Sequence, residues 1–306
     1  MPSANQLEYH VVDVFTTAAL AGNPLAVVMD TCGLSTDRMQ AIAREFNLSE
    51  TTFVERGDQS SAGSDGVRVR IFTTQEELNF AGHPTLGTAS VLLRTAPECV
   101  ENETVKLKLN VGTVPVRFSV AGLSGDAVYG EMTQRDPEFG AQLDRHEVAR
   151  LCGVSSEDLD SRLTPQVVST GTAFAIVALA SVEALGRLKV DHDAAAPWLR
   201  ERGGRWFYVL APSHQHDEDG ANHFRARMQF YGGEDPATGS AAGCAISFLV
   251  GHGAVASDAP VVVTQGVEIG RRSVIHLAAR KLDTGVTNVR VGGSTVPVAN
   301  GRLFLP

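Results

Sequence analysis

Residues 82–93 read GHPTLGTASVLL, and residues 235–250 read DPATGSAAGCAISFLV. Both stretches place a turn that contains glycine and proline directly before small and apolar residues, a pattern that predicts a buried helix. Each predicted helix is followed by strand-like runs, within 105–120 in the first half and within 261–278 in the second half. We interpret this repetition as a diverged internal duplication. It predicts two pseudo-symmetric domains with a cleft between them.

Strand-like and helical runs are mixed through the rest of both halves. A helix is expected between a cap at Ser35 or Thr36 and a stop at Asn47, because apolar residues recur there at helical spacing. A second short helix is expected over 146–152. The other predicted strands are 9–15, 25–29, 51–54, 67–72, 127–132, 174–179 and 206–210.

The length and the charge limit the classes of function. A chain of 306 residues fits two domains of about 150 residues each. The net charge of −9 argues against nucleic acid or an anionic membrane as a partner, since both attract basic surfaces. The sequence has no signal-peptide pattern and no apolar run of membrane-spanning length, and its four cysteines are scattered. We therefore expect a cytoplasmic protein with reduced thiols.

Three short segments could carry chemistry. In Gly82-His83-Pro84, proline suits the first helical position, and the free N–H groups of the helix start could bind an anion with His83 as donor or proton relay. Taken alone, this segment favours a simple helix start in which His83 only caps the helix. In the stretch EDPATGSAAG, Asp235 and Pro236 read as a helix cap and first helical residue.

The small residues that follow Asp235 and Pro236 have no such simple explanation. Gly239, Ser240 and the residues after them lack bulk, which lets a backbone or a ligand approach closely. They therefore favour a cradle of N–H groups for a carboxylate or phosphate. The third segment is Asn-Leu-Ser-Glu at 47–50, and a glutamate such as Glu50 is usually solvated where a helix gives way to a strand. No P-loop and no dinucleotide fingerprint occurs in the chain.

Taken together and in order, these segments resemble the PhzF-like isomerases of phenazine biosynthesis, which have the diaminopimelate-epimerase-like fold. The resemblance covers nearly the whole chain. The stretches that carry it are 12–15 (VDVF), 22–24 (GNP), 43–50 (AREFNLSE), 71–73 (IFT), 77–78 (EL), 80–87 (FAGHPTLG), 234–243 (EDPATGSAAG) and 265–270 (QGVEIG).

The resemblance implies an α+β fold class with two domains, each a mixed sheet or barrel around a central helix, and a homodimer. It also implies that the last segment completes the first domain, giving 1–122 with about 287–306 and, as the second domain, 123–286. No cofactor and no metal are implied. The implied substrate is a small carboxylate or amino acid, cyclic or unsaturated, bound in the cleft between the domains.

The resemblance also assigns roles to individual residues. Glu50 would act as base and then as acid, moving a proton between two carbons of one conjugated system. Burial would raise the pKa of such a carboxyl toward neutrality, which makes it a better base. His83 and Asp235 would complete the catalytic set. The substrate-binding positions are Asn23, Ser49, Gly82, Gly239 and Ser240.

Several departures and alternatives remain open. Thr74, Asn79 and the segment 228–233 differ from the family's pattern beside the expected pocket, which leaves the substrate undecided. Related epimerases use one cysteine in each domain, whereas Cys244 lies a turn inside the second helix and reads as a small buried thiol. An epimerase or lyase and a non-catalytic binding protein are the alternative functions. A metal site is the alternative for the loop with His214, His216, Asp217, Glu218, Asp219 and His223.

Overall fold

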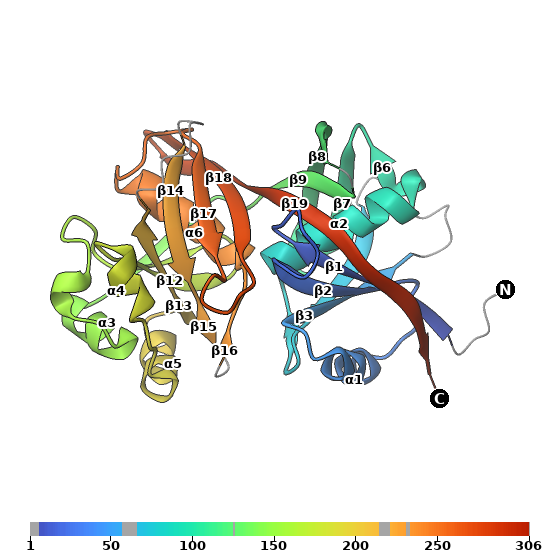
Figure 1. Cartoon of the computed structure of the whole chain (residues 1–306), viewed down its shortest axis with the longest axis horizontal. Coiled ribbons are helices and arrows are strands. Elements are labelled where there is room, and N and C mark those ends of the chain that lie inside the picture. The colour runs from blue at the N-terminus through green and yellow to red at the C-terminus, as the bar shows by residue number, and fades with distance from the viewer. Residues whose placement is uncertain (1–5, 57–65, 125, 214–220, 231–232, 306) are drawn as a thin grey trace. The chain divides into compact units, whose positions relative to one another are not determined.

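The computed structural model describes residues 6–56, 66–124, 126–213, 221–230 and 233–305 (Figure 1). The chain divides into two compact units. Unit 1 comprises residues 1–132 and 292–306, and unit 2 comprises residues 133–291. The chain thus passes between the units ten residues after the first boundary expected from the sequence and five after the second. No helix within the described residues is both long and apolar enough to cross a membrane.

Unit 1 is a mixed sheet built around one helix, α2 (Gly82–Thr95). The helix contacts strands β1, β2, β3, β7 and β8, and every residue from Gly82 to Leu92 is buried. Gly87 permits this close packing, because a Cβ there would lie 2.6 Å from Leu25 and 2.8 Å from Val14. The strands around it are β1 (Gln6–Val14), β2 (Asn23–Val28), β3 (Glu50–Glu55), β4 (Val67–Phe72), β5 (Glu77–Leu78), β6 (Val100–Glu101), β7 (Thr104–Leu109), β8 (Gly112–Ser124) and β9 (Ala127–Thr133).

The directions of these strands place the start of β3 beside β2. Strand β2 is antiparallel to β1 and parallel to β3, with Leu25 paired to Glu50. A parallel pair needs a crossover, and α1 (Thr36–Phe46) provides it. The side chain of Ser35 accepts a hydrogen bond from the Arg38 amide, and Asn47 ends the helix in a left-handed conformation. Both predicted ends of this helix are confirmed.

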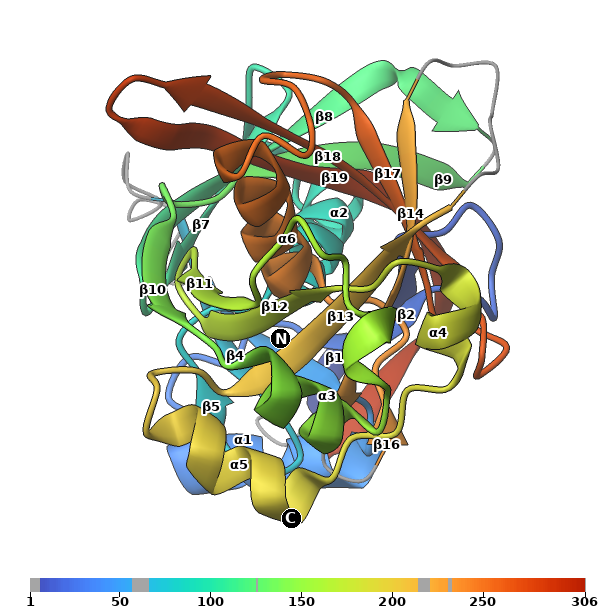
Figure 2. The same ribbon diagram turned by 90° about the vertical axis from the view of Figure 1, so that its left-hand side faces the viewer.

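Unit 2 contains parallel and antiparallel strands around a second buried helix, α6 (Gly239–Gly251). This helix contacts β11, β12 and β18, and every residue from Gly239 to Val250 is buried. Figure 2 shows α6 among the strands of unit 2. The sheet runs β10 (Glu138–Gln142), β11 (Gln166–Ser169), β12 (Ala173–Ala178), β13 (Trp206–Pro212), β14 (Asn222–Arg227), β17 (Val261–Gln265) and β18 (Ser273–Leu282). A separate hairpin pairs β15 (Gln229–Phe230) with β16 (Gly233–Glu234).

Three helices form a second core in unit 2 with residues of β12 and β13. Of these, α3 (Arg145–Cys152) matches the predicted short helix, whereas α4 (Val182–Gly186) and α5 (His192–Arg200) were not predicted. Helix α4 spans five residues, and α5 has Pro197 in its interior. Short length and an interior proline both weaken a helical pattern.

The final strand was predicted only as an implied return of the chain. Strand β19 (Gly285–Phe304) is 20 residues long and continues from unit 2 into unit 1, where it pairs antiparallel with β1. Its register shifts between Val11 and Val12 of β1, where Val12 pairs with Pro297. Proline cannot donate to a ladder, and a bulge accommodates it. The glycines and the proline in β19 hide so long a strand from a reading of sequence pattern.

Candidate active site

Unit 1 brings Glu50 and His83 into contact. Glu50 is the first residue of β3, and His83 is the second residue of α2. Oε2 of Glu50 lies 3.3 Å from Nε2 of His83, and the exposed fractions of the two side chains are 11% and 3%. The two atoms are in contact, but the angle between them does not meet the geometry of a hydrogen bond. The glutamate is therefore largely buried, in contrast to the usual solvated position at such a junction.

Asn23 holds the other nitrogen of the same imidazole. Its side-chain Nδ2 lies 3.1 Å from Nδ1 of His83, and Asn23 is fully buried at the start of β2. An amide N–H₂ is a donor only, so Nδ1 is the acceptor in this contact and the ring proton resides on Nε2. That proton is on the side of the ring that faces Glu50. The sequence named all three residues, and the structure brings them together.

The imidazole of His83 is neutral. Complete burial lowers the pKa of His83 to about 3, because desolvation penalises the charged form. The contact with Glu50 is accordingly between a carboxyl group and a neutral ring, not an ion pair. A neutral imidazole with its proton on Nε2 can donate a hydrogen bond to Glu50 or to an atom of a bound molecule.

The start of α2 differs from the prediction in one detail. Pro84 occupies the third helical position and not the first, since the helix begins at Gly82 with Ala81 as N-cap. No side chain caps this end and no acidic residue lies in its first turn. The first backbone N–H groups of a helix have no acceptor inside the helix, and they favour negative charge. The helix start can therefore receive an anion.

In unit 2, the cap predicted at Asp235 is wrong. Helix α6 begins at Gly239, its N-cap is Thr238, and Asp235 lies in the loop after β16. The Thr238 hydroxyl donates to Oδ2 of Asp235 at 2.6 Å instead of capping the helix. Pro236 is therefore outside the helix, in the turn 235–238 that precedes it. Asp235 is buried, with an exposed fraction of 5%.

The small residues of α6 have a partner within unit 2. Gly239 and Ser240 are the first two helical residues, both buried, and Gln134 donates from Nε2 to the Gly239 carbonyl at 2.9 Å. A Cβ on Gly243 would lie only 1.9 Å from Oε1 of Gln134. At Gly243 the missing bulk thus accommodates a protein side chain, whereas we had expected a backbone or a ligand there.

Cys244 is a structural thiol. It is fully buried, its sulfur lies 3.5 Å from the Thr170 hydroxyl, and burial raises its pKa to about 11. A thiol with so high a pKa is protonated near neutral pH and is a poor base. The interpretation of Cys244 as a buried thiol is confirmed.

Three of the remaining predicted positions, Ser49, Thr74 and Asn79, belong to unit 1. Ser49 is half-buried directly before Glu50. Thr74 lies in the turn contacted by α1, where Arg44 donates to its carbonyl, and Asn79 is exposed. Residues 231–232 and 214–220, which include most of the alternative metal loop, lie outside the described residues. Within the described part of the chain, no group of three or more His, Cys, Asp or Glu side chains could hold a metal ion.

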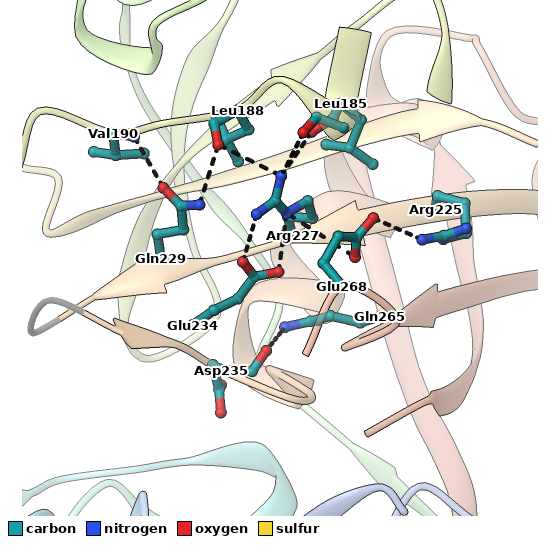
Figure 3. Close-up of polar contacts among 11 residues, drawn as sticks. Leu185, Leu188, Val190, Arg225, Arg227, Gln229, Glu234, Asp235, Gln265 and Glu268 are labelled. Carbon is teal, nitrogen blue, oxygen red and sulfur yellow. Dashed lines mark hydrogen bonds and ion pairs between the residues drawn. The ribbon is translucent and has the colours of Figure 1, made fainter. Parts of the chain in front are cut away.

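Sequence reasoning missed Gln265, which contacts the turn 235–238. Gln265 is fully buried at the end of β17, and its side chain bonds the Asp235 carbonyl at 2.9 Å (Figure 3). It stands at the end of the apolar run VVVTQ and directly before glycine. A polar side chain at the buried end of an apolar strand is the signal that could have found it.

Comparison with known proteins gives consistent matches over nearly the whole chain. The family model of phenazine biosynthesis-like proteins (PhzC/PhzF) matches residues 12–301. An uncharacterized isomerase of Mesorhizobium japonicum is 37% identical, over 97% of this chain and 98% of its own length. The trans-2,3-dihydro-3-hydroxyanthranilate isomerase of Pseudomonas aeruginosa is 36% identical, over 97% of this chain and 99% of its own length.

Solved structures give the same match at the level of the fold. A Pseudomonas aeruginosa protein described as a predicted epimerase superposes with a TM-score of 0.81 at 34% identity, covering 98% of this chain and 100% of that one. A hydroxyproline epimerase from Agrobacterium vitis has a TM-score of 0.61 at 12% identity, covering 100% and 94% of the two chains. The second match concerns the fold alone.

Proposed function

The chain belongs to the PhzC/PhzF phenazine biosynthesis-like family and is an isomerase of that family, and we propose that it shifts a proton on a small carboxylate substrate with Glu50 as acid and base. The observation that carries this proposal is the contact of Glu50 with a buried, neutral His83 whose proton is directed by Asn23. A solvated glutamate is a poor base toward carbon, whereas burial disfavours the charged form of a carboxylate and so makes it a stronger base.

The proposed reaction needs one group that works in both directions. The Glu50 carboxylate takes a proton from one carbon of a conjugated system, and the electron pair left behind spreads through that system. The same carboxyl then returns the proton to another carbon, so that atoms and electrons balance and the double bond has moved. Charge that grows on the substrate is stabilised by donors fixed beforehand, here the Nε2–H of His83 and uncapped helix N–H groups.

The proposed substrate is a cyclic or unsaturated amino acid or carboxylate. The curated relative at 36% identity is named for an isomerase of dihydro-hydroxyanthranilate, a compound of this class. We assign Asp235, Ser49, Gly82, Gly239 and Ser240 to binding the polar groups of the substrate. Thr74 and Asn79 differ from the family's sequence pattern beside the expected pocket. The same chemistry on a substrate other than that of the relative is compatible with these differences.

The finer organisation expected from the family is part of the proposal. It comprises two duplicated halves of the diaminopimelate-epimerase type, each with its sheet around α2 or α6, and a homodimer. The burial of both helices along their whole first turns supports the duplication. We also propose a cytoplasmic protein, which four free cysteines support, since thiols persist in a reducing compartment.

Deuterium incorporation from D₂O, followed by NMR, tests the function. The protein would be incubated with a panel of cyclic and unsaturated amino acids, including dihydroaromatic ones. Glu50→Gln is the test variant, and Glu55→Gln, at the half-exposed other end of the same strand, is the matched control. Deuterium must enter a carbon with the wild type and with Glu55→Gln but not with Glu50→Gln.

The pattern of labelling separates the alternatives. Label at a new carbon together with a shifted double bond supports the isomerase. Label at the original carbon with loss of chirality would instead identify an epimerase. Undiminished incorporation with Glu50→Gln would refute the assigned base.

A further inference from the structure

We propose that Gln265 is the positioning residue of the Asp235 half of the site: it fixes the turn 235–238, the direction of the Asp235 carboxylate and the start of α6. The inference rests on the proposed function for the role of Asp235. It rests on geometry alone for the turn itself, since every contact lies within unit 2.

The side-chain amide of Gln265 uses its full hydrogen-bonding capacity. Nε2 donates to the Asp235 carbonyl at 2.9 Å and to the Thr238 hydroxyl at 2.9 Å. Oε1 accepts from the Thr238 backbone N–H at 3.1 Å and from the Tyr208 hydroxyl at 3.2 Å. An amide has two donor protons and two acceptor lone pairs, and here all four are engaged. Gln265 therefore ties both ends of the turn 235–238 to the end of β17.

These contacts also set the direction of the Asp235 carboxylate. The Thr238 hydroxyl oxygen accepts a hydrogen bond from Gln265 and lies 2.6 Å from Oδ2 of Asp235. A hydroxyl has a single proton to donate. With one of its two lone pairs accepting from Gln265, the hydroxyl donates its proton to the carboxylate, which is a stronger acceptor than the nearby Met228 sulfur at 3.1 Å. Gln265 thus acts on Asp235 through Thr238.

The next residue holds the same turn by close packing. Gly266 has φ +75°, and a Cβ there would lie 2.6 Å from the Pro236 carbonyl oxygen and 2.4 Å from that of Arg271. Only glycine combines this backbone conformation with so close an approach. Gln265 therefore bonds the two ends of the turn, and Gly266 packs against its middle at Pro236.

A separate ion pair holds the chain just before the turn. Arg227 donates to Glu234 through two nitrogens, at 2.9 and 2.6 Å, and also to the carbonyls of Leu185, Gly186 and Leu188 (Figure 3). This network ties β16 to the end of α4. Among the described residues, the bonds of Arg227 to Glu234, Leu185, Gly186 and Leu188 do not involve Thr238, whose amide and hydroxyl are bonded to Gln265.

The test uses variants that separate positioning from stability. Gln265→Met removes all four hydrogen bonds, and Tyr208→Phe removes only the weakest. Gln166→Met is the matched control, because Gln166 is a buried glutamine of the same unit that bonds the Gly140 carbonyl and His252, away from the turn. Hydrogen exchange of the Thr238 amide, relative to amides of β12, reports the turn without any substrate.

The expected result is faster exchange at Thr238 in Gln265→Met only, with kcat lower by about tenfold or more, as a misplaced site residue costs. Tyr208→Phe and Gln166→Met should stay within about twofold of wild type, well inside what local misplacement costs. In a double-mutant cycle, the effects of Gln265→Met and Thr238→Val on kcat should be less than additive, because one of the bonds lost in Gln265→Met is to the Thr238 hydroxyl.

Three outcomes would overturn the inference: unchanged exchange at Thr238, a loss of kcat equal to that of Gln166→Met, or effects that add in the cycle. Failure of the proposed function gives a different pattern. In that case no variant, including wild type, would incorporate deuterium into a substrate, and the exchange at Thr238 would still decide whether Gln265 positions the turn.

Discussion

Nε2 of His83 lies 3.3 Å from Oε2 of Glu50, while Nδ1 of the same ring accepts a hydrogen bond from Asn23. Three segments distant in sequence make this relationship: the first residue of β2, the first residue of β3 and the first turn of α2. Because burial lowers the pKa of His83 to about 3, the ring is neutral and its tautomer is what matters.

Asn23 should therefore control activity through the imidazole. Asn23→Ala removes the donor to Nδ1, so the ring proton is free to move there and Nε2 no longer presents one to Glu50. We expect kcat to fall by roughly 10- to 100-fold, within the range that general acid–base groups contribute. Asn110→Ala, at an exposed position of the same unit, is the control for loss of an amide. Equal kcat values for the two variants would contradict the assigned tautomer.

The buried His83 also predicts how stability depends on pH. Its folded pKa, about 3, is below the usual value near 6.5, so between these pH values the unfolded chain binds a proton that the folded protein does not. Stability is therefore fully present above about pH 6.5 and is lost as pH falls toward 3, by at most about 1.4 kcal/mol per pH unit for this group.

Urea unfolding of wild type and His83→Asn at pH 4, 5 and 6 measures this contribution. The slope of the unfolding free energy against pH should be smaller in His83→Asn. The difference should be at most about 1.4 kcal/mol per pH unit, which corresponds to one bound proton. His252, whose pKa is lowered by burial and by Lys281, is present in both proteins and cancels in the comparison. Identical slopes would show that His83 titrates normally in the folded state.

Gly243→Ala should destabilise unit 2. The new Cβ would lie 1.9 Å from Oε1 of Gln134, whose amide is held by the Gly239 carbonyl and the Thr170 hydroxyl. Moving Gln134 aside breaks these buried bonds, and we expect a loss of about 1–3 kcal/mol. In Gly186→Ala the Cβ meets no atom within 4 Å, so thermal unfolding should show no comparable loss. Adding Gln134→Ala to Gly243→Ala should relieve the clash.

Arg227→Met should be strongly destabilising, because it leaves Glu234 buried without its partner. The two side chains are 9% and 8% exposed, and breaking such a buried pair costs about 3–5 kcal/mol. Arg227→Met with Glu234→Met should recover most of the loss, since an apolar pair replaces the buried charges. Arg150→Met, which breaks an exposed pair with Glu147, is the control and should leave the unfolding midpoint unchanged. A double variant no more stable than Arg227→Met would contradict this account.

The sequence by itself determined the family, the two buried helices and the strands whose apolar patterns are strong. It also named Glu50, His83 and Asn23, because the motifs that carry them are local and continuous. The ends of α1 followed from Ser35 and Asn47 for the same reason, since capping is a contact between near neighbours.

Tertiary structure alone decided how these residues act. The cap expected at Asp235 did not form, because the Thr238 hydroxyl bonds Asp235 and the helix starts later, at Gly239. The absence of a side chain at Gly243 leaves room for Gln134, which is 109 residues away in the chain. The turn before α6 is held by Gln265. Strand β19 is equally non-local, since its pairing with β1 joins the two ends of the sequence. Such contacts depend on which distant segments the fold places side by side, and no local pattern of residues encodes that choice.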